Sequence, residues 1–353
     1  MKLVVIGIFL FLTVILVFVA LIFIISNLKP GDQPENPADL SFSLPATSTL
    51  IPTVPKVTIT ITPTMESQEL DVTITPTNSL AVFTSPTGTL IPTPSIESTT
   101  NPKDGAIIVQ IPSGEFWMGS EPEWDPFYWG AEGPAHKVYL DAYWMYQTEV
   151  TNAQYQACVT ERACPKPEMT NSETRQEYYG NPQYANYPVV FVSYTHAVSY
   201  CNWAGGKLPT EAQWEKAARG TGKELFPWGN DLPDGTLGNY CDVNCTESYR
   251  EKSIDDGYRD TSPVGNYPAG ASPYGIYDMA GNVWEWVFDW FNAGFYAGSM
   301  YENPRGPASS NTRVVRGGSF MNDETGLRVV ARYYQDPSRA KNFLGFRCVI
   351  NEN

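Results

Sequence analysis

The sequence predicts an α+β globular domain with few regular elements, which follows an N-terminal membrane-spanning helix and an extended linker. Of the 353 residues, all ten Trp lie after Phe116 and all six Cys lie after Thr151. Large aromatic side chains and cysteines are typical of a packed core, so one domain is expected over residues 105–353. Its apolar runs are short and separated by Gly and Pro, which limits the length of its helices and strands.

The N-terminal segment is predicted to cross a membrane. Residues 3–25 are apolar apart from Thr13, carry no charge and are flanked by Lys2 and Lys29. A helix of this length reaches about 35 Å, enough to cross the hydrocarbon core of a bilayer. Residues 1–29 are therefore expected to be a transmembrane signal anchor that partners the membrane. A cleaved signal peptide is the alternative, although its apolar core is usually shorter.

Residues 30–104 are expected to form a disordered linker. They contain 12 Pro, 16 Thr and 8 Ser but only two aromatic residues, Phe42 and Phe83. Such a composition buries too little apolar surface to fold and favours an extended chain with polyproline character. The hydroxyl groups are candidates for glycosylation, and a plain spacer is the simpler interpretation.

The cysteines indicate an oxidising compartment. Their number is even, and the spacing suggests that Cys158 pairs with Cys164 and Cys241 with Cys245, which leaves Cys201 and Cys348. Six cysteines allow fifteen pairings, so the spacing alone leaves the pattern open. No Cys-x-x-Cys zinc motif is present, which favours disulfides. The domain is thus expected on the extracytoplasmic side of the cell membrane, in a single-pass protein.

Charge and histidine content exclude several function classes. The net charge is −15 and the chain contains two His. Nucleic-acid binding depends on Lys and Arg neutralising phosphates, so an acidic chain without a basic run is not expected to bind nucleic acid. Two His cannot supply three imidazole ligands, which excludes many zinc and non-haem iron enzymes. The excess of carboxylates suits calcium better.

Three helices are expected inside the domain. Ser193 can cap a helix that runs to about Ala204, where a pair of glycines follows. Thr210 and Gln213 form a capping box at the start of a second helix. A third is expected over Ala153–Val159. Short strands and loops account for the remainder.

The segment Asp278–Trp290, with the sequence DMAGNVWEWVFDW, contains a carboxylate in apolar surroundings. Glu285 stands between two Trp and needs either a cationic side chain or a metal ion, because a lone buried charge costs several kcal/mol. Asp278 and the backbone around Gly281 can add oxygen ligands, which together describe a calcium site. An Arg-paired structural Glu is the alternative. A second acidic group, Asp255–Gly257, suits either another calcium loop or an ordinary turn.

The order of motifs resembles the formylglycine-generating enzyme family, also called sulfatase-modifying factor domains. The motifs that carry the resemblance span nearly all of the domain: GEFWMGS (114–120), EGPAH (132–136), TEVTNAQY (148–155), PVVFVSY (188–194), KLPTEAQWEKAARG (207–220), FPWGN (226–230), SPVGNYP (262–268), YGIYDMAGNVWEW (274–286), RVVRGGSF (313–320) and LGFRC (344–348). The resemblance implies a single domain with a C-type-lectin-like core.

The resemblance also implies two structural calcium ions and one disulfide. One ion would be held by Asp278, the carbonyls of Gly281 and Val283, and Glu285. The other would be held by Asn239, the Tyr240 carbonyl, Asp256 and the Tyr258 carbonyl. The positions of Cys201 and Cys348 match a family disulfide. A second family disulfide is absent, because its positions hold Ala218 and Val329.

Active members of the family oxidise a sulfatase cysteine with molecular oxygen and copper(I) bound by two thiolates. Copper(I) prefers soft thiolate ligands. Here the first thiolate position falls on Asn322, and the second falls in a shortened stretch between Asp323 and Arg328, so copper is not expected. The oxygen-pocket positions are retained as Trp284 and Ser319. With Asn322 they are the candidate pocket residues. Core packing of Trp284 and a backbone cap by Ser319 are the favoured explanations of the two retained positions.

Two functions are therefore carried forward. The first is a non-catalytic, calcium-stabilised binding or scaffold module, which would bind a protein or glycan ligand through loops 292–304 and 322–343. Within it, the C-terminal region also resembles lectin-like variable proteins. The alternative is an oxidoreductase of the formylglycine-generating type, or a related oxidation with altered active-site residues.

Overall fold

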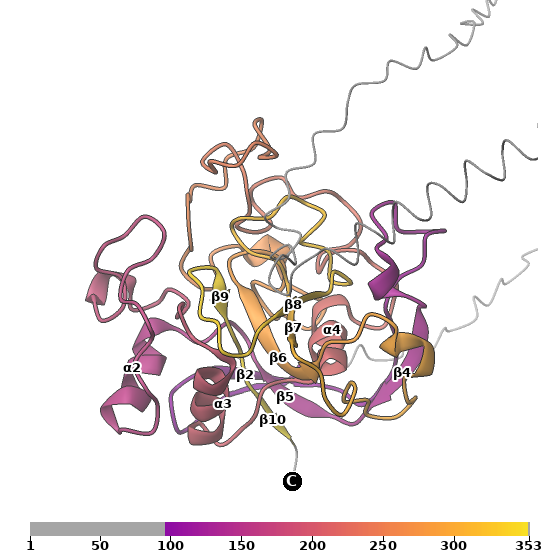
Figure 1. Cartoon of the computed structure of the whole chain (residues 1–353), viewed down its shortest axis with the longest axis horizontal. Coiled ribbons are helices and arrows are strands. Elements are labelled where there is room, and N and C mark those ends of the chain that lie inside the picture. Colours follow the sequence, from indigo (N-terminus) through magenta and orange to yellow (C-terminus); the bar gives the residue numbers. More distant parts are fainter. Residues whose placement is uncertain (1–95, 352–353) are drawn as a thin grey trace, which may run out of the picture. The chain divides into compact units, whose positions relative to one another are not determined.

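The computed structural model describes residues 96–351, and this part of the chain is a single compact unit (Figure 1). The predicted anchor at residues 1–29 and linker residues 30–95 lie outside the described residues. No helix within residues 96–351 is long and apolar enough to span a membrane.

Ten short strands form two four-stranded sheets and one hairpin. Their bounds are β1 (Ser98–Thr100), β2 (Ile107–Ile111), β3 (Gly114–Met118), β4 (His136–Leu140), β5 (Tyr143–Tyr146), β6 (Trp284–Trp290), β7 (Arg313–Arg316), β8 (Tyr333–Gln335), β9 (Leu344–Gly345) and β10 (Val349–Asn351). One sheet has the order β1-β2-β5-β10 and the other β8-β7-β6-β9, while β3 pairs with β4. Only β6 and β9 run parallel among these pairs.

The three predicted helices are confirmed. They are α2 (Asn152–Thr160), α3 (Tyr194–Trp203) and α4 (Glu211–Arg219), and four 3-10 turns accompany them at Gly130–Glu132, Pro182–Tyr184, Pro268–Gly270 and Phe295–Gly298. Ser193 caps α3 and Thr210 caps α4 through the capping box with Gln213, as predicted. The capping side chains satisfy backbone N–H groups that have no partner inside the helix.

The strand β6 separates two hydrophobic clusters. Trp284 and Trp286 belong to the cluster that contains α2 and α3, whereas Val287 belongs to the cluster that contains α4 and the β3–β4 hairpin. Successive side chains of a strand point to opposite faces, so a single strand can serve both clusters. Figure 1 shows α3 and α4 on either side of β6. The segment WEWVFDW is thus the centre of the core.

The domain begins earlier than residue 105, and the assignment of residues 96–104 to the linker needs correction. Strand β1 pairs with β2, with Ser98 opposite Val109. Asn101 is buried and donates to the Tyr146 hydroxyl at 2.7 Å. The linker is rich in Thr and Ser, and these residues also occur in edge strands such as β1. Composition alone could therefore not show where the linker ends and the domain begins.

All three expected disulfides are present. Cys158 pairs with Cys164, Cys201 with Cys348 and Cys241 with Cys245. These six residues are every cysteine of the chain, so no thiol is left for metal binding or nucleophilic chemistry. The bridge from Cys201 ties α3 to the segment between β9 and β10.

Candidate functional site

The loop after β7 brings Ser319 and Asn322 together. Gly317 and Gly318 have φ angles of 96° and 74°, and a Cβ atom on Gly318 would lie 2.7 Å from the Gly326 carbonyl oxygen. Both positions therefore require glycine. The turn that they form places Ser319 fully inside the protein.

The side chain of Asn322 is used to hold this turn. Its Oδ1 accepts hydrogen bonds from the Ser319 hydroxyl at 2.9 Å and from the Ser319 backbone N–H at 3.0 Å. Its backbone carbonyl accepts from the Cys241 N–H at 2.8 Å. Asn322 therefore caps a tight loop at the position where the resemblance places a copper-binding thiolate.

The shortened stretch after Asn322 is a closed turn. Asp323 accepts hydrogen bonds from the backbone and hydroxyl of Thr325. Gly326 packs so closely on Asn322 that an added Cβ would lie 2.8 Å from the Asn322 Cβ. Leu327 follows and is fully buried in the core cluster that contains α4.

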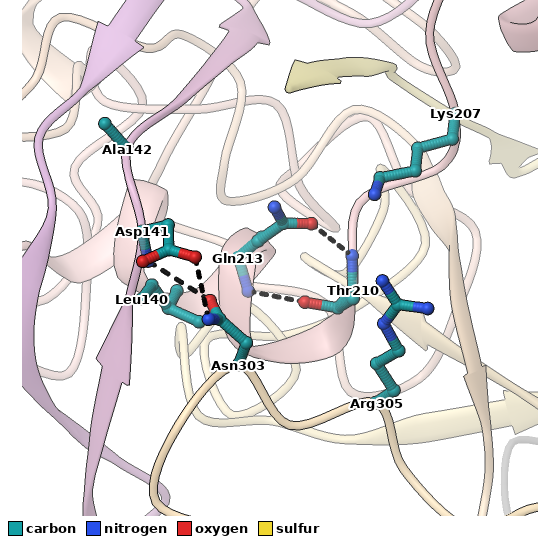
Figure 2. A pocket seen from close by; sticks show the side chains of 8 residues that line it. All are labelled: Leu140, Asp141, Ala142, Lys207, Thr210, Gln213, Asn303 and Arg305. Atoms are coloured by element: carbon teal, nitrogen blue, oxygen red, sulfur yellow. Dashed lines mark hydrogen bonds between the residues drawn. The ribbon is translucent and has the colours of Figure 1, made fainter. Parts of the chain in front are cut away.

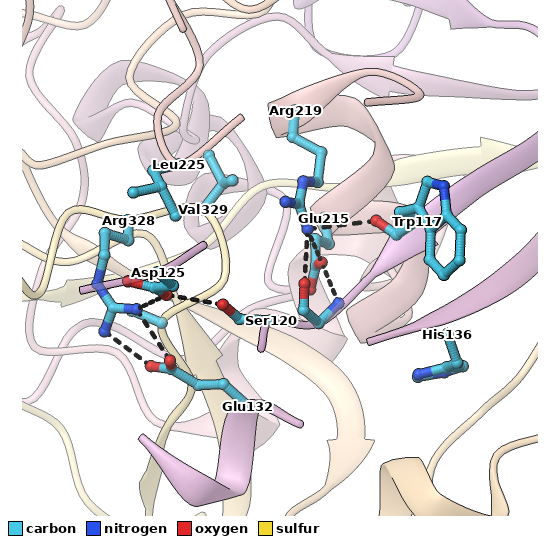
Figure 3. A network of polar contacts seen from close by, with 12 residues as sticks. Trp117, Ser120, Asp125, Glu132, His136, Glu215, Arg219, Leu225, Arg328 and Val329 are labelled. Carbon is cyan, nitrogen blue, oxygen red and sulfur yellow. Dashed lines mark hydrogen bonds and ion pairs between the residues drawn. The ribbon is translucent and has the colours of Figure 1, made fainter. Parts of the chain in front are cut away.

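Arg328 anchors the end of this turn in a buried ion network (Figure 3). Its guanidinium donates to Asp125 and makes two hydrogen bonds of 2.9 Å with the carboxylate of Glu132. Asp125 in turn accepts from the Ser120 hydroxyl at 2.8 Å. Burial raises the pKa of Glu132, an effect that the Arg328 charge opposes. The network fixes the loop by charge, in a region where the family's second disulfide is missing.

The positions of that missing disulfide are filled by apolar packing. Ala218 and Val329 are both fully buried in the core cluster that contains α4.

Trp284 is part of an aromatic stack. It is 5 % exposed and its ring lies 5.2 Å from the Tyr333 ring, in a stacked orientation. Tyr333 stacks on Tyr334 in the same way. Trp284 thus has a packing role in this structure, which is the structural explanation considered for it above.

The residues expected to bind one calcium ion gather around Asp256. Its carboxylate accepts from the backbone N–H groups of Tyr240 and Tyr258, each at 2.8 Å. The Oδ1 of Asn239 is buried and has no hydrogen-bond partner, and burial raises the pKa of Asp256 to about 7. An unpartnered buried amide oxygen, and a carboxylate next to it in the fold through Tyr240, are the oxygen ligands that calcium accepts.

Glu285 is paired with a buried arginine. Arg347 donates to Oε1 at 2.7 Å and 3.0 Å and to Oε2 at 2.8 Å, and the Trp214 indole donates to Oε2 at 2.9 Å. All of these side chains are fully buried. Of the two roles considered for Glu285, these contacts are those of the Arg-paired structural glutamate.

Asp278 faces a second buried carboxylate that the motif analysis missed. Glu149 lies beside it, and Oε2 of Glu149 has no hydrogen-bond partner. Burial, and the repulsion between the two groups, raise the pKa of Glu149, while burial raises that of Asp278. Two buried carboxylates, one with an unpartnered oxygen, are groups that a hard cation such as calcium can bind. The one sequence signal for Glu149 is its position between Thr148 and Val150 in the motif TEVTNAQY.

Within residues 96–351, no three His, Cys, Asp or Glu side chains form a metal-binding group. The two sets described above contain at most two carboxylates each and depend on amide and carbonyl oxygens. Such ligands suit a hard cation such as calcium and do not suit copper or zinc.

Comparison with known proteins agrees with the motif order. Residues 94–352 match the family described as "Sulfatase-modifying factor enzyme 1-like domain". The formylglycine-generating enzyme of Streptomyces coelicolor is 34 % identical over 68 % of this chain and 88 % of its own length. The "inactive C-alpha-formylglycine-generating enzyme 2" of Bos taurus is 29 % identical over 68 % of this chain and 87 % of its own length. The solved structure of PvdO from Pseudomonas aeruginosa superposes with a TM-score of 0.60 at 25 % identity, covering 72 % of this chain and 98 % of PvdO.

Proposed function

The chain belongs to the sulfatase-modifying factor family, and from this premise we propose that it is a member without the copper oxidase chemistry, used as a calcium-stabilised binding or scaffold module. The observation that carries the proposal is Asn322, whose amide oxygen caps Ser319 where a thiolate would be needed. Because all six cysteines are in disulfides, no free cysteine is left to supply that thiolate.

We place this module outside the cytoplasm, displayed from a membrane by residues 3–25 and the linker. Three disulfides support that location, since such bonds persist in oxidising compartments. Two cavities support a binding role. They have volumes of about 190 and 670 Å³. The smaller includes Asn303 from loop 292–304, and the larger includes residues of loop 322–343, where a ligand face was expected.

The direct test is a peptide oxidation assay. The full chain in detergent, supplied with copper(I), oxygen and a Cys-x-Pro-x-Arg peptide, is expected to give no aldehyde by mass spectrometry. A formylglycine-generating relative run in parallel is the positive control. The Asn322→Cys variant is also expected to stay inactive, because one thiolate cannot hold copper(I) as the pair does. Aldehyde formation by the unmodified chain would establish the oxidoreductase alternative.

The binding part of the proposal is tested on protein and glycan arrays. Binding of a defined protein or glycan by the full chain would support a module that recognises a ligand. Absence of binding on both arrays, together with turnover of the peptide, would overturn the proposal.

Calcium is proposed as a structural ion held by Asn239, Asp256 and the carbonyls of Tyr240 and Tyr258. A ligand that binds only the folded state raises stability by about 2.7 kcal/mol at a concentration of 100 times its Kd. We expect calcium to raise the urea midpoint of the protein and EDTA to reverse the change.

The matched variants separate a specific site from general charge screening. Asp256→Asn is expected to remove most of the calcium-dependent increase, whereas Asp231→Asn, at an exposed aspartate, keeps it. An equal increase in both variants would contradict the assignment.

A further inference from the structure

A cavity of about 190 Å³ lies between the β4–β5 turn, the start of α4 and the loop around Asn303 (Figure 2). Its polar side chains divide into two groups. Lys207 and Arg305 lie at one side and Asp141 with Asn303 at the other, with Thr210 and Gln213 between them. None of these residues belongs to the loop that holds Ser319 and Asn322.

The two cations of the cavity have no acidic partner. Neither Lys207 nor Arg305 makes an ion pair or a side-chain hydrogen bond with any residue in the described range 96–351. Burial, and then the charge of Arg305, lower the pKa of Lys207. Two facing positive charges repel each other, and an anion placed between them would remove that repulsion. Of the two, Lys207 is half-buried and Arg305 is exposed.

Asp141, the acidic residue of the cavity, is hydrogen-bonded to Asn303. The carboxylate of Asp141 accepts from the Asn303 side-chain amide at 2.9 Å, and the Asp141 backbone N–H donates to the same side chain at 3.1 Å. This pairing keeps Asp141 at the far side of the cavity, where one of its oxygens remains available as an acceptor. Asp141 therefore does not neutralise the two cations.

Neutral polar groups line the space between. Gln213 uses its Oε1 to accept from the Thr210 backbone N–H at 2.9 Å, which leaves its amide nitrogen without a hydrogen-bond partner in the described part of the chain. The Thr210 oxygen accepts from the Gln213 N–H at 3.1 Å. An amide donor, a hydroxyl and a carboxylate oxygen match the alternating donors and acceptors of sugar hydroxyls.

We propose that this cavity binds the carboxylate-bearing sugar unit of an acidic glycan. In this arrangement the carboxylate of the sugar lies between Lys207 and Arg305, and the hydroxyl groups of the sugar ring face Gln213 and Asp141. The cavity is smaller than the 300 to 1,000 Å³ typical of drug-sized ligands, so about one sugar ring enters it. The proposal rests on the binding function proposed above and specifies its ligand class.

The test is a calorimetric titration of the full chain in detergent with glucuronate, glucose and sodium sulfate. Glucuronate is expected to bind about tenfold more tightly than glucose, because only glucuronate has the charge that the cations require. The Lys207→Gln/Arg305→Gln variant is expected to lose at least about tenfold in glucuronate affinity with an unchanged melting temperature. Arg339→Gln/Lys341→Gln removes the same charge from the other cavity and is expected to bind as the unmodified chain does.

Three results would overturn the proposal. They are equal glucuronate affinity in both double variants, no glucuronate binding by the unmodified chain, and binding of sulfate without glucuronate. Failure of this site remains distinct from failure of the proposed function. Glycan or protein binding that survives Lys207→Gln/Arg305→Gln leaves the function intact, and aldehyde formation on the peptide overturns the function alone.

Discussion

Replacing Arg347 with methionine is expected to destabilise the domain by about 3 to 5 kcal/mol, the cost of breaking a buried ion pair from one side. The guanidinium of Arg347 is fully buried and binds both oxygens of Glu285 as well as the carbonyl oxygen of Tyr277 at 2.9 Å. Its removal leaves Glu285, Glu149 and Asp278 together without a cation. Urea unfolding in EDTA measures the change without a contribution from calcium.

The loss should grow with pH. Burial already raises the pKa of Glu149 and of Asp278 in the folded protein. A carboxyl whose pKa is raised by folding favours the folded state at low pH, and this contribution is lost as pH rises through the folded pKa. Without Arg347 the pKa values rise further, so Arg347→Met is expected to be mildest near pH 4, about the unfolded carboxyl pKa, and most severe in alkali.

Two comparison variants make the prediction specific. Glu285→Gln is expected to cost less than Arg347→Met, because Asp278 and Glu149 can ionise as alternative partners of the arginine. Lys137→Met removes one member of an exposed ion pair with Glu115 and is expected to change stability by less than about 1 kcal/mol. Equal losses in Arg347→Met and Lys137→Met would show that the buried pair has no special role.

The Glu285 pair also shows how far the sequence alone could lead. The segment WEWVFDW predicted a buried glutamate that needs a partner, and two partners were physically acceptable. Choosing Arg347 required knowledge that β9 lies beside β6, which brings residue 345 next to residue 285. Such long-range pairing leaves no local pattern in the chain, unlike a helix cap, which is complete within four residues.

The difference between local and long-range contacts also explains which other features could be predicted. The caps Ser193 and Thr210 were predictable because their partners lie three residues away. Glu149 and Asp278 are far apart in the chain, and neither is marked by spacing as a member of an acidic pair. The cavity cations Lys207 and Arg305 were missed because an isolated Lys or Arg in a sequence is usually a solvated surface residue.

Removing the bridge between Cys201 and Cys348 by the double substitution Cys201→Ala/Cys348→Ala is expected to cost about 5 kcal/mol. The two residues are 147 positions apart, and the chain-entropy estimate of a disulfide's effect grows with the length of the loop that it closes. Guanidinium unfolding of the unmodified and substituted chains measures the difference. The expected change is large compared with the total stability of an ordinary domain.

The short bridge from Cys158 to Cys164 is the matched control, since it encloses a separation of six residues and is expected to contribute about 2 kcal/mol. Arg347 and Cys348 are neighbours, so the long bridge and the buried ion pair hold the same segment. Once the bridge is gone, part of that segment's order is already lost, and Arg347→Met should cost less than it does in the intact chain. Strictly additive effects would mean that the two interactions stabilise independent parts of the core.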